Sequence, residues 1–363
     1  MRPSFGEYIL EQERQEKRKR IKITIILLLF VLIIAAGAVA IVYLLNRDDA
    51  QSVSGNNGVE NLVDSTDFPY YTQEELDAQI AQANEAGSAA LLESMKQELE
   101  AGESAVEVFR HLYEDHLVMV SDGSYHFIPI QESLKKNDYT TENLQVLETG
   151  EYQYVENGQV TSYKGIDVSK FQGRIDWEAV AADGVQFAFI RVGNRGYGSG
   201  KILDDEGFKR NIEGATKAGI KVGVYFYTQA LNEEELMEEV EYVLEKIAPY
   251  QIDCPVVYDV EKVVGDEARM NVLTAEERTH LTKLFCDSIE AAGYKSMIYM
   301  NLEMAAMMLN LEELEEYDKW FAYYNPEMYF PYDYQVWQYS ESGTVAGVEG
   351  TVDLNICFEP IWE

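Results

Sequence analysis

Two carboxylates that follow a short apolar run, Asp259 and Glu261, have the type and spacing needed for acid–base chemistry. The run at residues 255–258 is typical of a buried strand. Alternate residues of a strand point the same way, so both carboxyl groups should lie on one face at the strand's end. Neighbouring carboxylates repel, which raises the pKa of one and provides a proton donor beside an anion at neutral pH. The plain alternative is a strand that ends in a solvated acidic loop.

The elements that must position this pair form an alternating pattern from residue 163 onward. Helical stretches separate the first five apolar runs, and Asp176, Asn232 and Thr274 stand where helix caps are expected. After the sixth run the connections lose helical length. The pattern predicts an α/β fold, an irregular TIM-like barrel of five β/α units plus three strands. The eight expected strands are residues 165–169, 186–192, 221–227, 255–260, 295–300, 319–324, 334–339 and 352–357.

Two further acids should join the pair, because catalysis in such barrels sits at the C-terminal ends of the strands. Asp167 lies on the first expected strand and Asp353 on the eighth, and these two strands are neighbours in a closed barrel. Each acid could instead be a structural residue that caps a loop. Other strand ends carry an arginine and aromatic rings, which suit a glycan cleft where rings stack on sugars. These are Arg191, Tyr225, Tyr227, Trp320, Tyr324, Trp337 and Tyr339.

The chain lacks the residues that several classes of catalytic or metal site require. The three cysteines fit neither a disulfide framework nor a zinc spacing, and buried free thiols are expected. Only His280 falls in the barrel region, which argues against a Ser-His-Asp triad or a His-ligated metal there. The formal charge is −35, and the first 22 residues carry +3, which leaves −38 for the rest. So acidic a body should repel nucleic acid.

The N-terminal residues predict a membrane anchor. Residues 1–22 form a basic tail, and residues 23–45 contain no charge. A helix of this length is about 34 Å long and could span a bilayer. The flanking charges place the tail in the cytoplasm and the body outside the cell. The alternative is a cleavable signal peptide, since residues 38–40 resemble a cleavage site, but the apolar run is long for one.

Between the anchor and the barrel, residues 46–71 read as a flexible linker and residues 72–162 as a small α+β module. A capping box that begins at Thr72 should open a helix that ends at Gly102, and a second helix follows. The two could form a helical hairpin or a dimerising stalk. Strands are expected at residues 124–130, 144–147, 152–155 and 160–163, with a hairpin turn at Asn157 and Gly158. Nothing in the module suggests catalysis, and it could position the enzyme, bind a partner or serve as a spacer.

The barrel region also carries a series of recognisable motifs. The stretch KGIDVSKFQGRIDW at residues 164–177 resembles the opening motif of glycoside hydrolase family 25, the Chalaropsis-type lysozymes or N-acetylmuramidases. The family's later motifs are matched in order by FIR at 189–191, GVYFY at 223–227, YDVE at 258–261, WQY at 337–339 and VDLN at 352–355. The resemblance covers about residues 163–363 and leaves out the anchor and the module.

The resemblance implies hydrolysis of the β-1,4 bond between N-acetylmuramic acid and N-acetylglucosamine in peptidoglycan, without a metal or organic cofactor. It makes Glu261 the general acid, with Asp259 orienting a substrate acetamido group that acts as internal nucleophile. Asp167 and Asp353 match the family's other cleft acids, with supporting roles. Tyr225 and Tyr324 match the family's substrate-facing aromatic residues. Together with Arg191, Tyr227 and Trp337, which lie at other strand ends, they are the candidate substrate-binding residues. One departure is Phe226, where many members carry histidine, and it puts a substrate contact in doubt.

Three functions remain open from the sequence. The leading one is a membrane-anchored enzyme that cuts peptidoglycan strands outside the cell. The second is a non-catalytic cell-wall glycan-binding or scaffold protein on the same barrel, and the third is a hydrolase of another aminosugar polymer such as chitin. The stereochemical outcome is also open, because the separation of carboxyl groups two residues apart on a strand depends on their rotamers. Repulsion between the acidic body and anionic wall polymers favours action close to the anchor.

Overall fold

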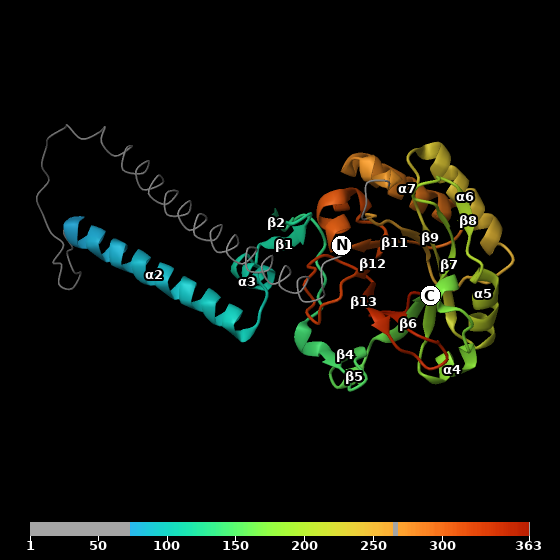
Figure 1. Ribbon diagram of the computed structural model, residues 1–363, viewed down its shortest axis with the longest axis horizontal. Helices are drawn as coiled ribbons and strands as arrows, with labels where there is room; N and C mark the ends of the chain where they lie inside the picture. The colour runs from blue at the N-terminus through green and yellow to red at the C-terminus, as the bar shows by residue number, and fades with distance from the viewer. Residues whose placement is uncertain (1–72, 264–267, 363) are drawn as a thin grey trace, which may run out of the picture. The chain divides into compact units, whose positions relative to one another are not determined.

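A computed structural model of the chain describes residues 73–263 and 268–362 (Figure 1). The chain divides into two compact units, Met1–Ala81 and Gln82–Glu363, and of the first only residues 73–81 are described. The predicted tail, anchor and linker lie outside the described residues. Within the described part, no helix has both the length and the apolar character that a bilayer span requires.

The module begins with two helices that do not pack as a helical hairpin. Helix α2 (Gln73–Ala101) ends before Gly102, whose φ is 104°. Leu91, Leu92 and Leu99 of α2 are 46%, 49% and 42% exposed, so the apolar face expected to cover the second helix is open. That second helix, α3 (Ala105–Leu112), is capped by the Ser104 side chain and packs on strand β1 instead. The two helices meet through the pair of Glu98 and His111 at 2.8 Å rather than through an apolar seam, and the dimerising stalk, the other arrangement that the sequence left open, stays a prediction.

The rest of the module consists of two small antiparallel sheets. Strands β1 (His116–Ser121) and β2 (Ser124–Pro129) join through Asp122 and Gly123, at φ 49° and 75°. These positive φ angles are the left-handed geometry of a tight hairpin turn. The sequence analysis did not predict β1, although the Asp-Gly pair that follows it is a strong turn signal. Strands β3 (Leu144–Val146), β4 (Tyr152–Glu156) and β5 (Gln159–Val160) form the second sheet. The predicted turn at Asn157 and Gly158 is confirmed at φ 50° and 78°.

Eight strands then close into a barrel, as predicted. They are β6 (Tyr163–Val168), β7 (Phe187–Arg195), β9 (Lys221–Tyr227), β10 (Val256–Asp259), β11 (Ser296–Asn301), β12 (Asp318–Ala322), β13 (Val336–Gly343) and β14 (Val352–Cys357). The barrel closes because β6 pairs with both β7 and β14. Strand β14 runs antiparallel to both of its neighbours, and a short unpredicted strand, β8 (Ile202–Asp204), pairs antiparallel with β7. These departures make the barrel irregular.

Four helices connect the first five barrel strands. They are α4 (Trp177–Ala182), α5 (Phe208–Lys217), α6 (Glu233–Ile247) and α7 (Ala275–Ala291). The predicted caps Asp176, Asn232 and Thr274 each accept a hydrogen bond from a backbone N–H of the first turn. Between β11 and β12 the chain forms only a π-turn, η4 (Met304–Met308), and a 3-10 turn, η5 (Leu311–Leu314). Helical length is therefore lost one strand earlier than predicted.

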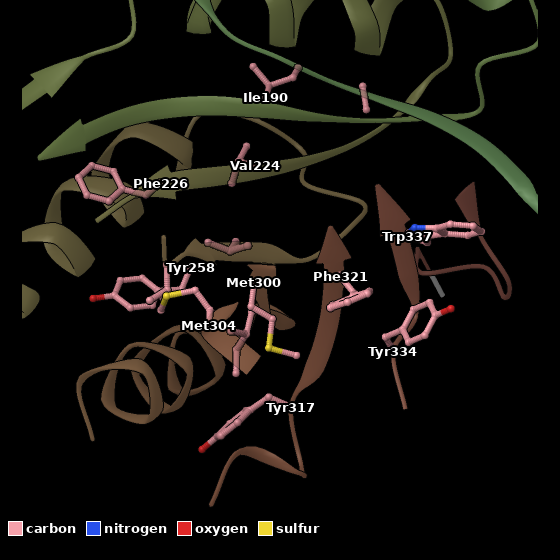
Figure 2. Close-up of a cluster of buried hydrophobic side chains, with 14 of the residues drawn as sticks. Ile190, Val224, Phe226, Tyr258, Met300, Met304, Tyr317, Phe321, Tyr334 and Trp337 are labelled. Carbon is pink, nitrogen blue, oxygen red and sulfur yellow. The ribbon is translucent and has the colours of Figure 1, made fainter. Parts of the chain in front are cut away.

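Two hydrophobic layers hold the barrel together. Alternate residues of the strands fill its interior, where the Phe189 ring stacks on Trp320 with centroids 4.5 Å apart. Gly165 and Gly223 allow this filling, because a Cβ at either would lie within 2.6 Å of the Phe187 or Phe189 ring. The intervening residues face outward, as Figure 2 shows for Ile190, Val224 and Phe321, and Phe321 stacks there on the Phe330 ring. Because the interior is filled, a site within the barrel can lie only at its mouth.

Candidate active site

The mouth of the barrel holds a cleft of about 320 Å³. Eight of the nine site residues predicted from the sequence line this cleft: Asp167, Arg191, Tyr225, Tyr227, Asp259, Glu261, Tyr324 and Asp353. The cleft also receives Ser169, Phe171, Gln172, Tyr299, Trp320, Gln338 and Glu341. The structure thus brings all four predicted carboxylates to one place.

Strand pairing sets the relative positions of these acids. Asp167 on β6 and Asp353 on β14 are direct register partners, as predicted from barrel closure. Asp259 on β10 lies between Tyr227 on β9 and Tyr299 on β11 in the sheet. One expectation needs correction: Asp353 stands at the beginning of its strand rather than at its end. It still reaches the mouth because β14 runs in the opposite direction.

Asp167 is a buried carboxylate with two amide partners. Its Oδ2 accepts hydrogen bonds from Gln338 Nε2 and Asn355 Nδ2, both at 2.8 Å. Asn355 is itself held by the indole of Trp320, whose Nε1 donates to Asn355 Oδ1 at 2.8 Å. Burial raises the pKa of Asp167, and the two amide hydrogen bonds oppose that rise. These donors orient Asp167 and stabilise its ionised form.

Asp259 is buried with an unpartnered oxygen. Its side chain is 7% exposed, and Oδ1 has no hydrogen-bond partner among the described residues. Burial, followed by the charges of Glu261 and Asp167, raises the pKa of Asp259 well above its ordinary value, while Arg191 opposes the rise. Asp259 lines the cleft, so its carboxyl group has unused capacity to accept a hydrogen bond at the place where a ligand would bind.

Glu261 has the properties of a proton donor. Burial raises the pKa of its carboxyl group, the polar interaction with the Tyr299 hydroxyl opposes the shift, and the charge of Asp167 adds to it. A carboxylic acid in such surroundings holds its proton to a higher pH than it would in water. Asp259 and Glu261 share one wall of the cleft, as the i, i+2 spacing predicted.

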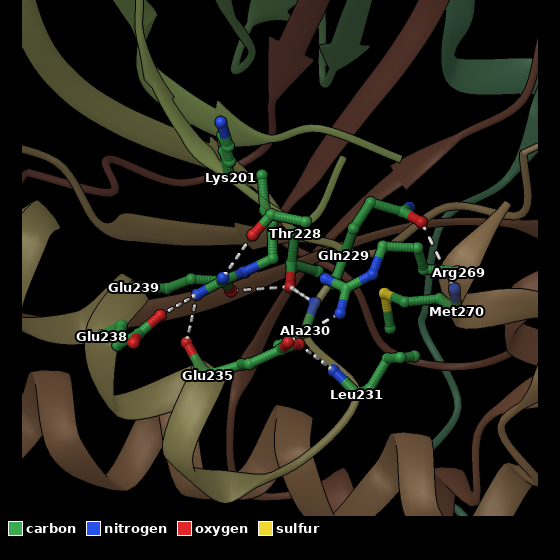
Figure 3. A network of polar contacts seen from close by, with 12 residues as sticks. Lys201, Thr228, Gln229, Ala230, Leu231, Glu235, Glu238, Glu239, Arg269 and Met270 are labelled. Carbon is green, nitrogen blue, oxygen red and sulfur yellow. Dashed lines mark hydrogen bonds and ion pairs between the residues drawn. The ribbon is translucent and has the colours of Figure 1, made fainter. Parts of the chain in front are cut away.

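A buried polar network lies behind Asp259 and holds the strand that carries it. The Thr228 backbone N–H donates to the Asp259 carbonyl at 3.2 Å, and the Thr228 hydroxyl donates to Glu239 Oε2 at 2.7 Å. Arg195 Nε donates to the other Glu239 oxygen at 2.7 Å. Figure 3 shows Thr228 and Glu239 joined in this network, to which Arg269 and Gln229 also belong. Burial raises the pKa of Glu239 to about 7.

Gln338 was missed from the sequence, although it joins three residues of the cleft. The hydroxyls of Tyr299 and Tyr324 both donate to Gln338 Oε1 at 2.8 Å, and Gln338 Nε2 donates to Asp167. Its position therefore couples two aromatic walls to one carboxylate. An amide side chain between Trp337 and Tyr339, in an apolar strand, was the available signal.

Phe171 and Arg191 form another part of the cleft lining. Phe171 is 77% exposed, and the Arg191 guanidinium lies 5.0 Å from the centre of its ring. Arg191 Nε also donates to the buried carboxylate of Asp205 at 2.8 Å, which fixes its charge at the cleft. The Phe171 backbone is held by a capping box between Ser169 and Gln172. An exposed ring fixed at a cleft edge can stack on a sugar face, and the sequence reasoning did not select it.

Two assignments from the sequence are corrected. Trp337 does not reach the cleft: it is 1% exposed, packs in the outer layer (Figure 2) and donates from Nε1 to the Tyr323 carbonyl at 2.8 Å. Strand alternation explains this, because Gln338 points inward and its neighbours Trp337 and Tyr339 point outward. Phe226 also faces outward and contacts Tyr242 of α6, so the departure at this position touches no cleft contact.

The remaining candidate ligands do not form a site among the described residues. No group of three or more His, Cys, Asp or Glu side chains there is arranged to hold a metal ion. Cys254, Cys286 and Cys357 are buried free thiols, as predicted. His280 pairs with Glu233 on the exposed face of α7.

The Asp353 carboxyl group gives the fold a measurable pH dependence. Burial and the nearby Asp167 raise the pKa of Asp353 to about 9, against about 3.9 for an unfolded aspartate. Between these values the folded state binds more protons than the unfolded state, so its stability falls as pH rises. We expect Asp353→Asn to gain unfolding free energy relative to wild type between pH 5 and pH 9, measured by urea denaturation. Glu349→Gln, an exposed control, should show no such trend, and equal slopes for wild type and Asp353→Asn would contradict the assignment.

Comparison with known proteins agrees with this geometry. A model of the family described as glycosyl hydrolases family 25 matches residues 166–348. The autolytic lysozyme of Clostridium acetobutylicum is 29% identical over 196 residues, which are 53% of this chain and 55% of that protein. The uncharacterised protein YegX of Escherichia coli strain K12 is 30% identical over 204 residues, 53% of this chain and 68% of its own length. The chain thus spans about half the length of the first of these relatives.

Among solved structures, the bacterial lysozyme from Streptomyces coelicolor aligns with a TM-score of 0.44 and 25% identity. The alignment covers 53% of this chain and 90% of that chain.

Proposed function

Because the chain belongs to the glycosyl hydrolases of family 25, we propose that it is a peptidoglycan hydrolase. It cleaves the β-1,4 bond between N-acetylmuramic acid and N-acetylglucosamine. The observation that carries the proposal is the pair Asp259 and Glu261, which line one cleft with raised pKa values among aromatic rings. Lysozyme is also the name of the Clostridium acetobutylicum relative.

Glu261 is the general acid of the proposed mechanism. Because its pKa is raised by burial, the carboxyl group keeps its proton to a higher pH than an exposed glutamate does. Transfer of that proton to the glycosidic oxygen makes the departing sugar a better leaving group as the sugar ring gains oxocarbenium character. The carboxylate that remains can then remove a proton from the water that completes hydrolysis.

Asp259 assists the nucleophile, which we place on the substrate. The oxygen of the acetamido group attacks the anomeric carbon. The nitrogen of the same group gains positive charge as the bond to the leaving group breaks. The carboxyl group of Asp259, which lines the cleft and has one oxygen without a partner among the described residues, can accept a hydrogen bond from the acetamido N–H. Because the charge develops next to this carboxyl group, the ionised form of Asp259 is favoured in the transition state more than in the ground state.

The other two acids stabilise positive charge without contacting the scissile bond. Asp167 holds its orientation through Gln338 and Asn355, and Asp353 lies beside it in register. Ionisation of Asp167 raises the pKa of Asp353, so the pair shares its protons and carries less than two negative charges at neutral pH. Substrate rings contact the walls built by Arg191, Tyr225, Tyr227 and Tyr324.

The substrate class is tested with two polymers. Purified protein should release soluble dye-labelled fragments from peptidoglycan and few from dye-labelled chitin. Release from chitin alone would assign another aminosugar polymer. Binding to peptidoglycan by a folded protein, with no release from either polymer, would favour a glycan-binding or scaffold role.

We further propose that residues 23–45 anchor the protein in the membrane as a single helix, with the catalytic domain outside the cell. The support is the uncharged run with basic residues before it. Tethering would keep an acidic enzyme concentrated near its own wall despite repulsion from anionic polymers, which suits local wall remodelling. Extraction of the full chain from membranes by alkaline carbonate, or protection of the barrel from protease added outside spheroplasts, would contradict this topology.

A further inference from the structure

Lys262, the residue directly after Glu261, joins the segment that carries Asp259 and Glu261 to the module of residues 72–162. Its Nζ lies 2.7 Å from Glu303 Oε1 and 2.9 Å from Asp122 Oδ2. Glu303 follows β11, the strand next to Asp259, and Asp122 lies in the turn of the β1–β2 hairpin. Ser121 of the same hairpin donates from its hydroxyl to Glu303 Oε1. Three segments that are distant in sequence therefore meet at one ammonium group.

The hairpin is held in place by a second set of contacts with the barrel. The backbone N–H of Val118 on β1 donates to the Tyr329 hydroxyl, and Arg110 of α3 lies 4.1 Å from the centre of the Tyr329 ring. Arg110 also donates from Nε to the Val118 carbonyl at 3.0 Å and from its guanidinium to the Tyr323 hydroxyl. Tyr323 precedes Tyr324, a residue of the cleft wall. The module thus contacts the loops after β10, β11 and β12.

Glu261 needs such support because it lies beyond its strand. Strand β10 ends at Asp259, and residues 260–263 belong to no helix or strand. The Val260 N–H still donates to the Tyr299 carbonyl at 3.3 Å, and Asn271 Nδ2 donates to the Val263 carbonyl at 2.8 Å. Between these two ties, the contacts of Lys262 fix the part of the backbone from which the Glu261 side chain projects.

We propose that the β1–β2 hairpin of the module is a positioning element for Glu261, acting through the contacts of Lys262 with Asp122 and Glu303. The proposal rests on the proposed function of Glu261 as general acid. It assigns the module a part in catalysis, in place of the spacer or partner-binding roles that the sequence left open.

The energetic character of the contact separates positioning from stabilisation. Asp122 is 84% exposed in its side chain, so its ion pair with Lys262 should add little to the free energy of unfolding. A small shift of a proton donor, by contrast, can lower a rate by an order of magnitude or more. Loss of the contact should therefore reduce kcat far more than it reduces stability or raises KM.

The experiment uses the full chain with Lys262→Met, Asp122→Asn, the double variant and the conservative Lys262→Arg. The matched control is Lys283→Met, which removes an exposed ion pair between α7 and Glu316 at 2.9 Å that does not involve residues 259–263. We expect kcat on peptidoglycan to fall about 10-fold in Lys262→Met and about 3-fold in Asp122→Asn, with KM changed less than 2-fold. The double variant should be no slower than Lys262→Met, because both changes act on the same contact. Lys262→Arg should recover most of the rate.

A second readout does not depend on turnover. Hydrogen–deuterium exchange of the backbone amides at residues 259–263 should be faster in Lys262→Met and Asp122→Asn than in wild type and Lys283→Met. Unchanged kcat in an active protein, additive losses in the double variant, or exchange equal to the control would each contradict the positioning role. A wild type without turnover would contradict the proposed function, while the exchange measurement would still decide whether the hairpin orders the segment.

Discussion

The Glu261→Gln variant is expected to lose peptidoglycan cleavage by about 10²- to 10⁴-fold in kcat, the range for removal of a general acid. The amide keeps the size of the side chain and its polar interaction with the Tyr299 hydroxyl, but it has no acidic proton to transfer. Because Glu261 is partly buried with a raised pKa, its neutral replacement should not lower the unfolding temperature. Rates of reducing-end release and thermal melts, measured on the same preparations, check both expectations.

A substrate with an activated leaving group makes this test more specific. Departure of a nitrophenolate requires little protonation, so Glu261→Gln should lose much less rate on a nitrophenyl aminosugar oligomer than on peptidoglycan. The exposed Glu349→Gln variant provides the matched control and should behave as wild type on both. Equal losses on the two substrates, or retained peptidoglycan cleavage, would remove Glu261 from the role of general acid.

The Asp259→Asn variant is expected to lose about 10²- to 10³-fold in kcat, as when one group that stabilises transition-state charge is removed. Asparagine can still accept a hydrogen bond from the acetamido N–H of the substrate. It carries no negative charge, however, and so cannot stabilise the positive charge that develops on the acetamido nitrogen. The same change should raise the unfolding temperature at pH 8. The reason is that Asp259 is buried with an unpartnered oxygen and pays a desolvation penalty when ionised.

Rates and melting temperatures of Asp259→Asn should therefore move in opposite directions, which a general structural defect would not produce. Chemically N-deacetylated peptidoglycan supplies the complementary test, since it lacks the proposed acetamido nucleophile. Wild type should cleave it at least 10²-fold more slowly than the acetylated polymer, on the scale of a lost intramolecular nucleophile. Equal cleavage of both polymers would reject the acetamido mechanism.

The barrel and its acidic centre could be predicted because they follow from local patterns. Apolar runs located all eight strands, and closure alone placed Asp167 beside Asp353. The i, i+2 rule put Asp259 and Glu261 on one wall. These patterns do not give the direction of a strand in the sheet, because an apolar run looks the same in either orientation. The antiparallel orientation of β14 was therefore not predicted.

Strand alternation also explains the error at Trp337. Strand β13 carries Trp337 and Tyr339 on one face and Gln338 on the other. The sequence analysis assigned the aromatic face to the cleft. In the structure the amide of Gln338 faces inward, because it satisfies Asp167 and the two tyrosine hydroxyls there. A buried carboxylate needs hydrogen-bond donors more than it needs another ring, and that requirement appears only when the strands are assembled.

The proposed role of the module also could not be predicted from local sequence patterns. Asp122 marks a turn in the sequence, and Lys262 reads as an ordinary surface cation. Their contact at 2.9 Å joins residues 140 positions apart. Contacts of this kind depend on how the hairpin docks against Tyr323 and Tyr329, which no single segment encodes.

Mass spectrometry of the soluble products from purified peptidoglycan, with Glu261→Gln in parallel, tests the central claim most directly. We expect wild type to produce fragments whose reducing end is N-acetylmuramic acid, and the variant to produce almost none. Fragments that end in reducing N-acetylglucosamine would contradict the bond assignment. The same muramic-acid ends from a folded Glu261→Gln protein would contradict the proposed acid.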